Sequence, residues 1–147
     1  MPLVEISHSR DALGEKQLDA LADRLSAIAL AAEGLPDTPT SRPLAVVTTR
    51  AWDGVHVGGR PSGEPRIDVV LHTLPGVLDE PARAAVLAEL TSAVVEEVDG
   101  MDARGGGRVW CRVHETLPSG FSVAGRVMSP PLVRQLAGCA DVDGRGR

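Results

Sequence analysis

Aromatic residues are scarce in this chain of 147 residues, which has two Trp, one Phe and no Tyr. The apolar residues that make up 43% of the chain must therefore build a core of Leu, Val, Ile and Ala. Any aromatic side chain becomes a candidate wall of a binding site. The length is typical of one compact domain, so we expect one active site per chain.

The sequence also lacks long runs of like charge and long apolar runs. The formal net charge is −5, and basic and acidic residues are interspersed, which gives no electrostatic reason to expect nucleic acid or an anionic membrane as a partner. No apolar run is long enough to cross a bilayer, and the first residues lack the features of a signal peptide. Cys111 and Cys139 have no disulfide-framework spacing. We expect a cytoplasmic protein with a small-molecule ligand.

The first half of the sequence predicts a strand, a helix and a second strand. Leu3–His8 is short and apolar. Apolar residues then recur at steps of three and four residues, which predicts a helix with one apolar face. These residues are Leu18, Leu21, Leu25, Ile28 and Ala32. Gly34 follows them, at a position where helices commonly end with a residue in the left-handed conformation. Leu44–Thr49 is rich in β-branched residues, which favours a strand, and the glycine-punctuated segment Gly54–Gly59 closes this unit.

The same order returns in the second half. Arg66–His72 predicts a strand, and Asp79 is the expected cap of a helix with Pro81 in its first turn. The apolar stripe of this helix is Ala84, Leu87, Leu90, Val94 and Val98. The helix is expected to end near Gly100. Val109–Glu115 predicts a further strand, and Gly120–Gly125 follows it.

Two pairs of corresponding glycines are separated by the same number of residues. Gly100 follows Gly34 by 66 residues, and Gly120 follows Gly54 by the same 66 residues, which indicates a duplicated β-α-β unit. Right-handed crossovers make the two strands of each unit parallel. We therefore predict an α+β fold with a four-stranded sheet and two helices on one face. We expect the other face to be apolar and covered by oligomerisation.

The same patterns set the expected boundaries. A single domain spans residues 1–137, with unit one at 2–59, a linker at 60–65 and unit two at 66–131. The polar, glycine-rich residues 138–147 are expected to form a flexible tail.

The strand that begins with Pro2 directly after the initiator Met, the β-α-β unit and the Gly-x-x-x-Gly-Gly hairpin resemble the tautomerase superfamily typified by 4-oxalocrotonate tautomerase. Two fused units of this total length are similar to the cis-3-chloroacrylic acid dehalogenase branch. The resemblance spans Pro2 to Pro131. It implies a tautomerase fold like that of macrophage migration inhibitory factor, assembly as a homotrimer, no cofactor, and catalysis by Pro2.

The chemistry of Pro2 also follows from its position. Removal of Met1 would leave a secondary amine at the chain terminus. An apolar pocket disfavours the ammonium form, so the pKa of this amine would fall below the ordinary α-amino value of about 7.7 to 8.0. Such an amine can remove a proton from carbon and return it elsewhere. The alternative is that Pro2 only begins an edge strand.

The resemblance implies roles for two further residues. Glu115 ends the fourth predicted strand, where the dehalogenase branch carries a water-activating or substrate-polarising glutamate, so it would act as general acid or base opposite Pro2. Phe121 falls where the family hairpin places an apolar aromatic near the proline, and there it would exclude water. The alternatives are a solvated carboxylate at the end of a strand and an aromatic that only fills the core.

The loop after the third predicted strand departs from that branch. The branch carries two arginines there that bind a substrate carboxylate, and residues 72–77 contain none. Replacement cations are Arg112, which shares a strand face with His114, and Arg10, which follows the first strand. For each arginine the alternative is a surface ion pair. The helical histidine of the branch is replaced by Ala29, so we do not expect hydrolytic dehalogenation.

The residues together predict an isomerase. We expect keto-enol or double-bond tautomerisation of a small carbonyl or enol compound, without a cofactor. No metal is expected, because His72, His114 and Cys111 lack a recognised ligand spacing. Two alternatives remain open: a decarboxylase or hydratase of a small unsaturated or oxo acid, and a non-catalytic trimeric protein that binds a ligand.

The proposed amine exists only after cleavage of Met1, which gives a first prediction. The intact mass of the purified protein should be smaller than that of the full sequence by one methionine residue. Quantitative retention of Met1 in active protein would eliminate a mechanism that uses the Pro2 amine.

Overall fold

The computed structural model describes residues 2–98, 101 and 107–139, and the chain folds as two successive β-α-β units, each followed by a short hairpin. The elements of the first unit are β1 (Leu3–Ser9), α1 (Glu15–Ala32), the 3-10 helix η1 (Arg42–Leu44), β2 (Val46–Trp52), β3 (His56–Val57) and β4 (Arg60–Pro61). Those of the second are β5 (Ile67–Thr73), α2 (Glu80–Glu97), β6 (Val109–Glu115), the 3-10 helix η3 (Pro118–Gly120), β7 (Ser122–Val123) and β8 (Arg126–Val127). A third helix, α3 (Pro130–Leu136), follows.

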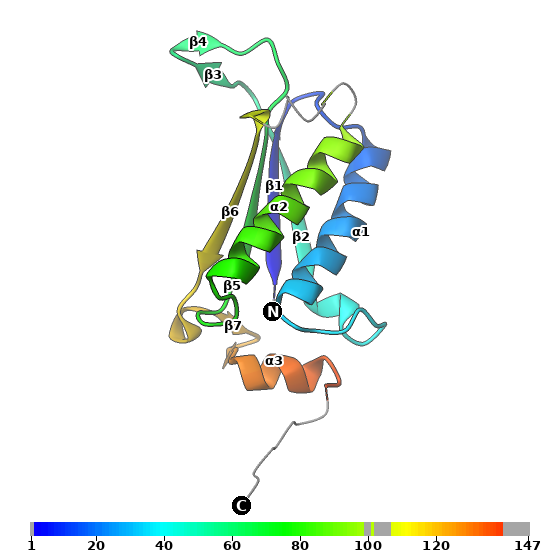
Figure 1. Ribbon diagram of the computed structural model, residues 1–147, viewed down its shortest axis with the longest axis vertical. Helices are drawn as coiled ribbons and strands as arrows, with labels where there is room; N and C mark the ends of the chain where they lie inside the picture. The colour runs from blue at the N-terminus through cyan, green and yellow to red at the C-terminus, as the bar shows by residue number, and fades with distance from the viewer. Residues whose placement is uncertain (1, 99–100, 102–106, 140–147) are drawn as a thin grey trace, which may run out of the picture.

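The four long strands form one mixed sheet in the order β2-β1-β5-β6. Strands β1 and β2 are parallel, as are β5 and β6, and the two units join where β1 pairs antiparallel with β5. Helices α1 and α2 pack against each other and cross the same face of the sheet (Figure 1). The duplicated α+β architecture predicted from the sequence is confirmed.

Local signals place the ends of both long helices. Gly34 adopts φ 66° after α1, in the left-handed region that favours glycine. The Asp79 carboxylate accepts a hydrogen bond of 2.8 Å from the Ala82 amide at the start of α2, so the predicted cap is confirmed. Gly100, the predicted end of that helix, lies outside the described residues.

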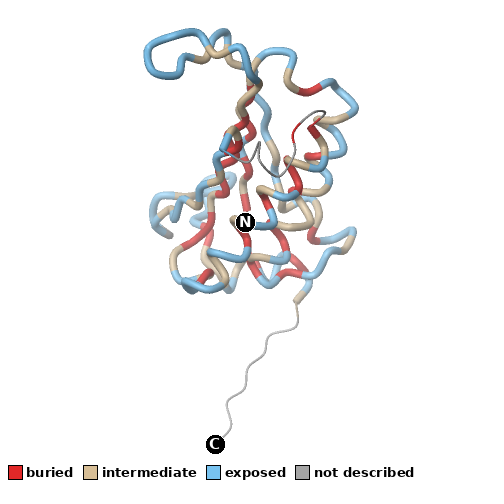
Figure 2. The backbone as a smooth tube through the Cα atoms, turned by 45° about the horizontal axis from the view of Figure 1, so that its top comes forward, coloured by how far each residue is buried: buried red, intermediate tan, exposed pale blue. Residues whose placement is uncertain are grey.

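The core lies between the helices and the sheet, where buried segments alternate along the strands (Figure 2). Its fully buried members include Val4, Ile6, Leu21, Leu25, Ile67, Val69, Leu71, Leu90 and Val94. The stripe predicted for α2 is partly wrong, because Ala84 is exposed, whereas Val86 and Ala93 are buried. This helix packs against both α1 and β6, which turns its buried face away from Ala84.

The face of the sheet turned away from the helices is not apolar, so this expectation was wrong. Apolar residues such as Val70 alternate there with polar residues that face one another across strands. Asp68 is only 6% exposed, because Arg112 on the neighbouring strand binds both of its carboxylate oxygens, at 3.2 and 2.5 Å. A charge can occupy this face because its partner lies in the adjacent strand.

Helix α3 is not among the elements predicted from the sequence. Its signals are Ser129, whose hydroxyl accepts from the Leu132 amide, and the prolines of the first turn. The helix closes the end of the fold at which β1 begins (Figure 1). A second core cluster forms there from Leu30, Leu35, Leu74, Met128, Val133 and Ala137.

Two further findings concern the predicted linker at residues 60–65 and the character of the helices. Strand β4 occupies Arg60–Pro61, so a strand lies within the segment predicted as a linker. Among the described residues, none of the helices has the length and apolarity needed to span a membrane.

The core analysis gives a prediction about stability. Leu71 is fully buried at the centre of the sheet, so Leu71→Ala should reduce the free energy of unfolding by about 2 to 5 kcal/mol, measured by urea denaturation. The matched control Leu136→Ala removes the same atoms from a side chain that is 43% exposed, and the change should stay below about 1 kcal/mol. Equal losses would contradict this placement of the core.

Candidate functional site

Pro2 lies at the start of β1, inside the fold. Its side chain is fully buried, and its carbonyl oxygen accepts a hydrogen bond of 3.1 Å from the Val46 amide. Leu3 pairs with His72 on β5, so the same register places Pro2 opposite Thr73. Because strand side chains alternate, Pro2 shares the helix-facing side of the sheet with Val4.

A buried carboxylate stands on the same side. Glu33, the residue that ends α1, is 9% exposed, and its Oε1 accepts a hydrogen bond of 3.0 Å from the hydroxyl of Thr73. Thr73 is itself only 3% exposed. The contact connects the end of α1 to the strand position opposite Pro2. Glu33 was not identified from the sequence, since a glutamate at a helix end is ordinarily solvated.

Glu115 lies at the same end of the sheet. It pairs with Thr73 in the parallel register of β5 and β6, which places it two strands from Pro2. Its carboxylate binds the guanidinium of Arg83, from the first turn of α2, at 2.5 Å. The partly exposed Glu115 is therefore fixed in orientation by a cation that the sequence analysis missed.

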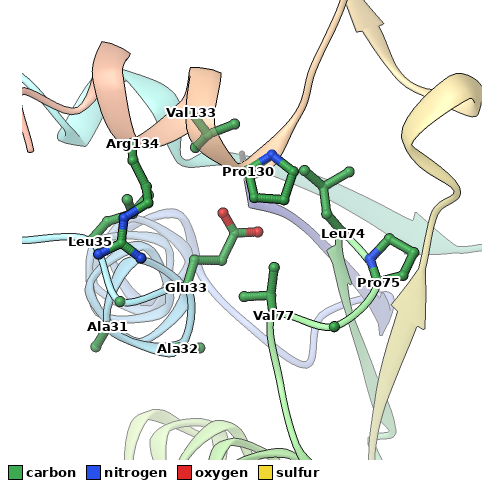
Figure 3. A pocket seen from close by; sticks show the side chains of 12 residues that line it. Ala31, Ala32, Glu33, Leu35, Leu74, Pro75, Val77, Pro130, Val133 and Arg134 are labelled. Atoms are coloured by element: carbon green, nitrogen blue, oxygen red, sulfur yellow. The ribbon is translucent and has the colours of Figure 1, made fainter. Parts of the chain in front are cut away.

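A cavity of about 370 Å³ opens between the end of α1, the loop after β5 and helix α3 (Figure 3). Leu74, Val77 and Val133 line it, and polar atoms contribute about as much of its surface as apolar atoms. The carboxylate of Glu33 points into this space between α1 and α3 (Figure 3). Arg134 of α3 also lines the cavity and makes no side-chain hydrogen bond or ion pair with the described residues. The cavity thus offers one buried acceptor and one exposed cation.

A smaller cavity of about 50 Å³ lies next to the first one, and Leu74 lines both. Its other walls are Leu3, His72, Thr73, Thr116 and Phe121. Phe121 is half-buried and packs against the α3 cluster. The structure therefore places Phe121 near the start of β1, and its role as a catalytic wall stays a prediction.

The other predicted site residues lie elsewhere. Arg112 and His114 face the opposite side of the sheet, where Arg112 binds Asp68 and His114 stacks edge to face with His72 at 5.4 Å. Arg10 follows the far end of β1 and forms an ion pair with Asp53. The structure does not bring these three residues together with Pro2 within one chain.

The histidines and Cys111 do not form one cluster either. Cys111 faces the helices, where burial raises the pKa of its thiol and the Thr91 hydroxyl lies 3.4 Å from its sulfur. His72 and His114 face the other side. Within the described ranges, His, Cys, Asp and Glu nowhere gather in a group of three or more that could hold a metal ion.

Comparison with known proteins identifies the fold. No protein-family model and no curated protein matches the sequence. Among solved structures, N1, a member of the cis-3-chloroacrylic acid dehalogenase family, aligns with a TM-score of 0.70 at 16% identity over 92% of this chain and 99% of its own. A fused 4-OT, a wild-type symmetric trimer, aligns with a TM-score of 0.68 at 20% identity over 88% and 97%.

A third neighbour, Pt0534 inactivated by 2-oxo-3-pentynoate, has a TM-score of 0.68 and 21% identity over 85% of this chain and 94% of its own. All three are tautomerase-superfamily proteins. The chain therefore has the tautomerase-superfamily fold, in the form built from two fused 4-OT-like units.

Proposed function

We propose that this protein is an isomerase that moves a proton in a small carbonyl or enol compound, with the amine of Pro2 as its base. The observation that carries the proposal is the burial of Pro2 at the start of β1, opposite Thr73, whose hydroxyl donates to a buried carboxylate that points into a cavity of about 370 Å³. An amine at this position would be shielded from water, and Thr73 and Glu33 would connect it to space for a substrate. These are the conditions that proton transfer to and from carbon requires.

Glu115 and Phe121 complete the proposed site. Glu115, held by Arg83 at 2.5 Å, would polarise the substrate oxygen or a water from the β6 side. Phe121 would form part of the apolar wall next to Leu3. Any contribution from Arg10, Arg112 or His114 would require a second copy of the chain, since these residues lie away from Pro2.

One structural neighbour suggests a chemical probe. Pt0534 is inactivated by 2-oxo-3-pentynoate, an electrophile of a kind that amines attack. We propose that the Pro2 amine of this chain is open to the same reaction, and adduct formation by intact mass would locate it.

The alternative reactions use the same base. Decarboxylation or hydration of a small unsaturated or oxo acid would need a cation for the substrate carboxylate, and Arg134 is the arginine of the cavity wall. A non-catalytic trimeric binding protein is the alternative outside enzymology. An enol-to-keto assay with an uncharged enol and with its carboxylated counterpart distinguishes these possibilities.

Assembly is a second prediction of the proposal. Several apolar side chains beyond the core remain exposed, among them Trp110 at 56% and Val127 at 53%. The fused 4-OT neighbour is a trimer, and we expect a homotrimer here as well. Light scattering at micromolar concentration should give three times the chain mass, whereas a monodisperse monomer would contradict the prediction.

Catalysis is tested by Pro2→Ala, which keeps a chain-terminal amine but makes it primary and more flexible. We expect kcat/KM for enol ketonisation to fall by about 100- to 10,000-fold, while circular dichroism shows that the fold is retained. Pro81→Ala, at an exposed proline in the first turn of α2, is the matched control and should keep full activity. Glu115→Gln should lower activity less than Pro2→Ala if Glu115 only polarises the substrate.

Full turnover by Pro2→Ala on every enol tested would contradict the proposed role of the Pro2 amine. The absence of turnover by the wild-type protein on both the uncharged and the carboxylated enol would favour the non-catalytic alternative.

A further inference from the structure

His72 of β5 contains a buried nitrogen whose bonding is incomplete. Its Nε2 is shielded from solvent and has no aligned hydrogen-bond partner among the described residues. Oε2 of Glu5, on β1, lies 3.2 Å from that nitrogen, which is the distance of an ion pair once the imidazole is protonated. Buried polar atoms in folded proteins nearly always have a partner, and an exception calls for a specific explanation, such as a catalytic role.

The two neighbouring strands hold the imidazole in place. Glu5 contacts it from β1, and the ring of His114 on β6 packs against it edge to face, with ring centroids 5.4 Å apart. Arg112, the other charged residue of β6 on this face, is bound to Asp68 of β5. Among the described residues, Nδ1 of His72 has no hydrogen-bond partner and, unlike Nε2, is not closed off from solvent. Nδ1 is therefore the nitrogen that a ligand can reach.

The imidazole lines the cavity of about 50 Å³ described above. Thr73 faces the helices, whereas His72 and Leu3 face the other side of the sheet, and all three line this cavity. The cavity therefore lies across the end of the two strands. His72 pairs with Leu3, the residue that follows Pro2, and paired residues have Cβ atoms about 4.5 to 5.5 Å apart. A ligand at this end of the sheet would be within reach of both the imidazole and the chain-terminal amine.

The volume of the small cavity suits one oxygen-bearing end of a ligand. A water molecule occupies about 30 Å³ in the liquid, so about 50 Å³ holds one water, or a single hydroxyl or carbonyl group with its carbon. Apolar atoms contribute most of its surface, and no described arginine or lysine lines it. The remainder of a substrate would extend past Leu74, which also lines the cavity of about 370 Å³.

We propose that His72 is a second catalytic residue, whose Nδ1 exchanges a proton with the substrate oxygen while the Pro2 amine exchanges one with carbon. The proposal rests on the proposed function and deepens it. Glu5 is a positioning residue, because a carboxylate beside Nε2 favours the tautomer with the proton on Nε2 and leaves the lone pair of Nδ1 free to accept. Catalytic contacts that are poorly aligned in a free enzyme often tighten when substrate binds.

The protons balance in the ketonisation of an enol. The Pro2 ammonium gives its proton to the enol carbon, whose double-bond electron pair forms the new C–H bond. The enol O–H bond breaks as the carbonyl forms, and Nδ1 of the neutral imidazole takes that proton. Water then carries a proton from the imidazolium to the neutral amine, so both groups return to their starting states.

The same arrangement indicates which group the substrate presents to His72. A neutral imidazole accepts a hydrogen bond from a hydroxyl, whereas the nearby Glu5 carboxylate repels an anion. The substrate class is therefore an enol whose hydroxyl-bearing end is uncharged. Any carboxylate of the substrate would lie at its other end, in the larger cavity that Arg134 lines.

The first measurement is the pH–rate profile of enol ketonisation. Nδ1 must be deprotonated to accept a proton and the amine must be protonated to give one, so the wild-type rate should fall at both low and high pH. His72→Gln keeps a polar group beside Glu5 but cannot titrate. We expect kcat to fall by about 100- to 10,000-fold in this variant, and the decrease at low pH to be lost. A slowed variant that keeps the wild-type profile would show a structural role and overturn the proposal.

The second measurement does not depend on turnover. ¹⁵N NMR of protein labelled with ¹⁵N-histidine distinguishes a protonated from an unprotonated ring nitrogen, and in the alkaline range the proton of His72 should reside on Nε2. Glu5→Gln should reduce the fraction protonated at Nε2 and slow ketonisation, with circular dichroism unchanged. A proton on Nδ1 in the wild-type protein overturns the proposal, even if His72→Gln does not fold.

Controls separate this proposal from the proposed function. His56→Gln changes an exposed histidine of β3 and should leave the rate, its pH profile and the His72 tautomer unchanged. Full turnover by His72→Gln, in a protein whose activity requires Pro2, overturns the role of His72 alone. A wild type that ketonises no enol overturns the isomerase activity and the catalytic role of His72 together. Full turnover by Pro2→Ala with slow turnover by His72→Gln overturns the role of Pro2 and supports that of His72.

Discussion

Strands β1 and β5 pair antiparallel from Leu3 opposite His72 to His8 opposite Ile67, and the backbone pairing of the two units depends on this contact. Each unit alone covers only one helix with two strands, which leaves much of its apolar surface in water. The central pairing combines both into one four-stranded sheet whose core includes Leu21 of α1 and Leu90 of α2. It also fixes the position of Pro2 relative to Thr73.

The antiparallel relation of the units explains why polar groups gather at one end of the sheet. Within each unit the helix runs opposite to its strands, so α1 ends and α2 begins at the end where β1 starts. Glu33 from the end of α1 and Arg83 from the start of α2 therefore approach the same edge, and each meets a residue at the end of a strand. Helix α3 then covers this edge through Val133 and the apolar residues around it.

The candidate site combines two charge arrangements of different character. Glu115 is paired with a permanent cation and partly exposed, so its orientation is fixed by a contact within the chain. Glu33 is buried and accepts a hydrogen bond from the Thr73 hydroxyl, so its carboxylate is tied to the strand position opposite Pro2. Local periodicity could not reveal either arrangement, because each joins residues at least 32 positions apart.

The sequence by itself determined the duplicated β-α-β order, the left-handed end of α1 at Gly34 and the cap of α2 at Asp79, since these depend on residues a few positions apart. It also directed attention to Pro2. Only the tertiary structure decided that Arg112 and His114 face away from Pro2, that the open face of the sheet is partly charged, and that α3 closes the cavity. Those features depend on strand order, on register and on which charges find partners, and no local pattern encodes them.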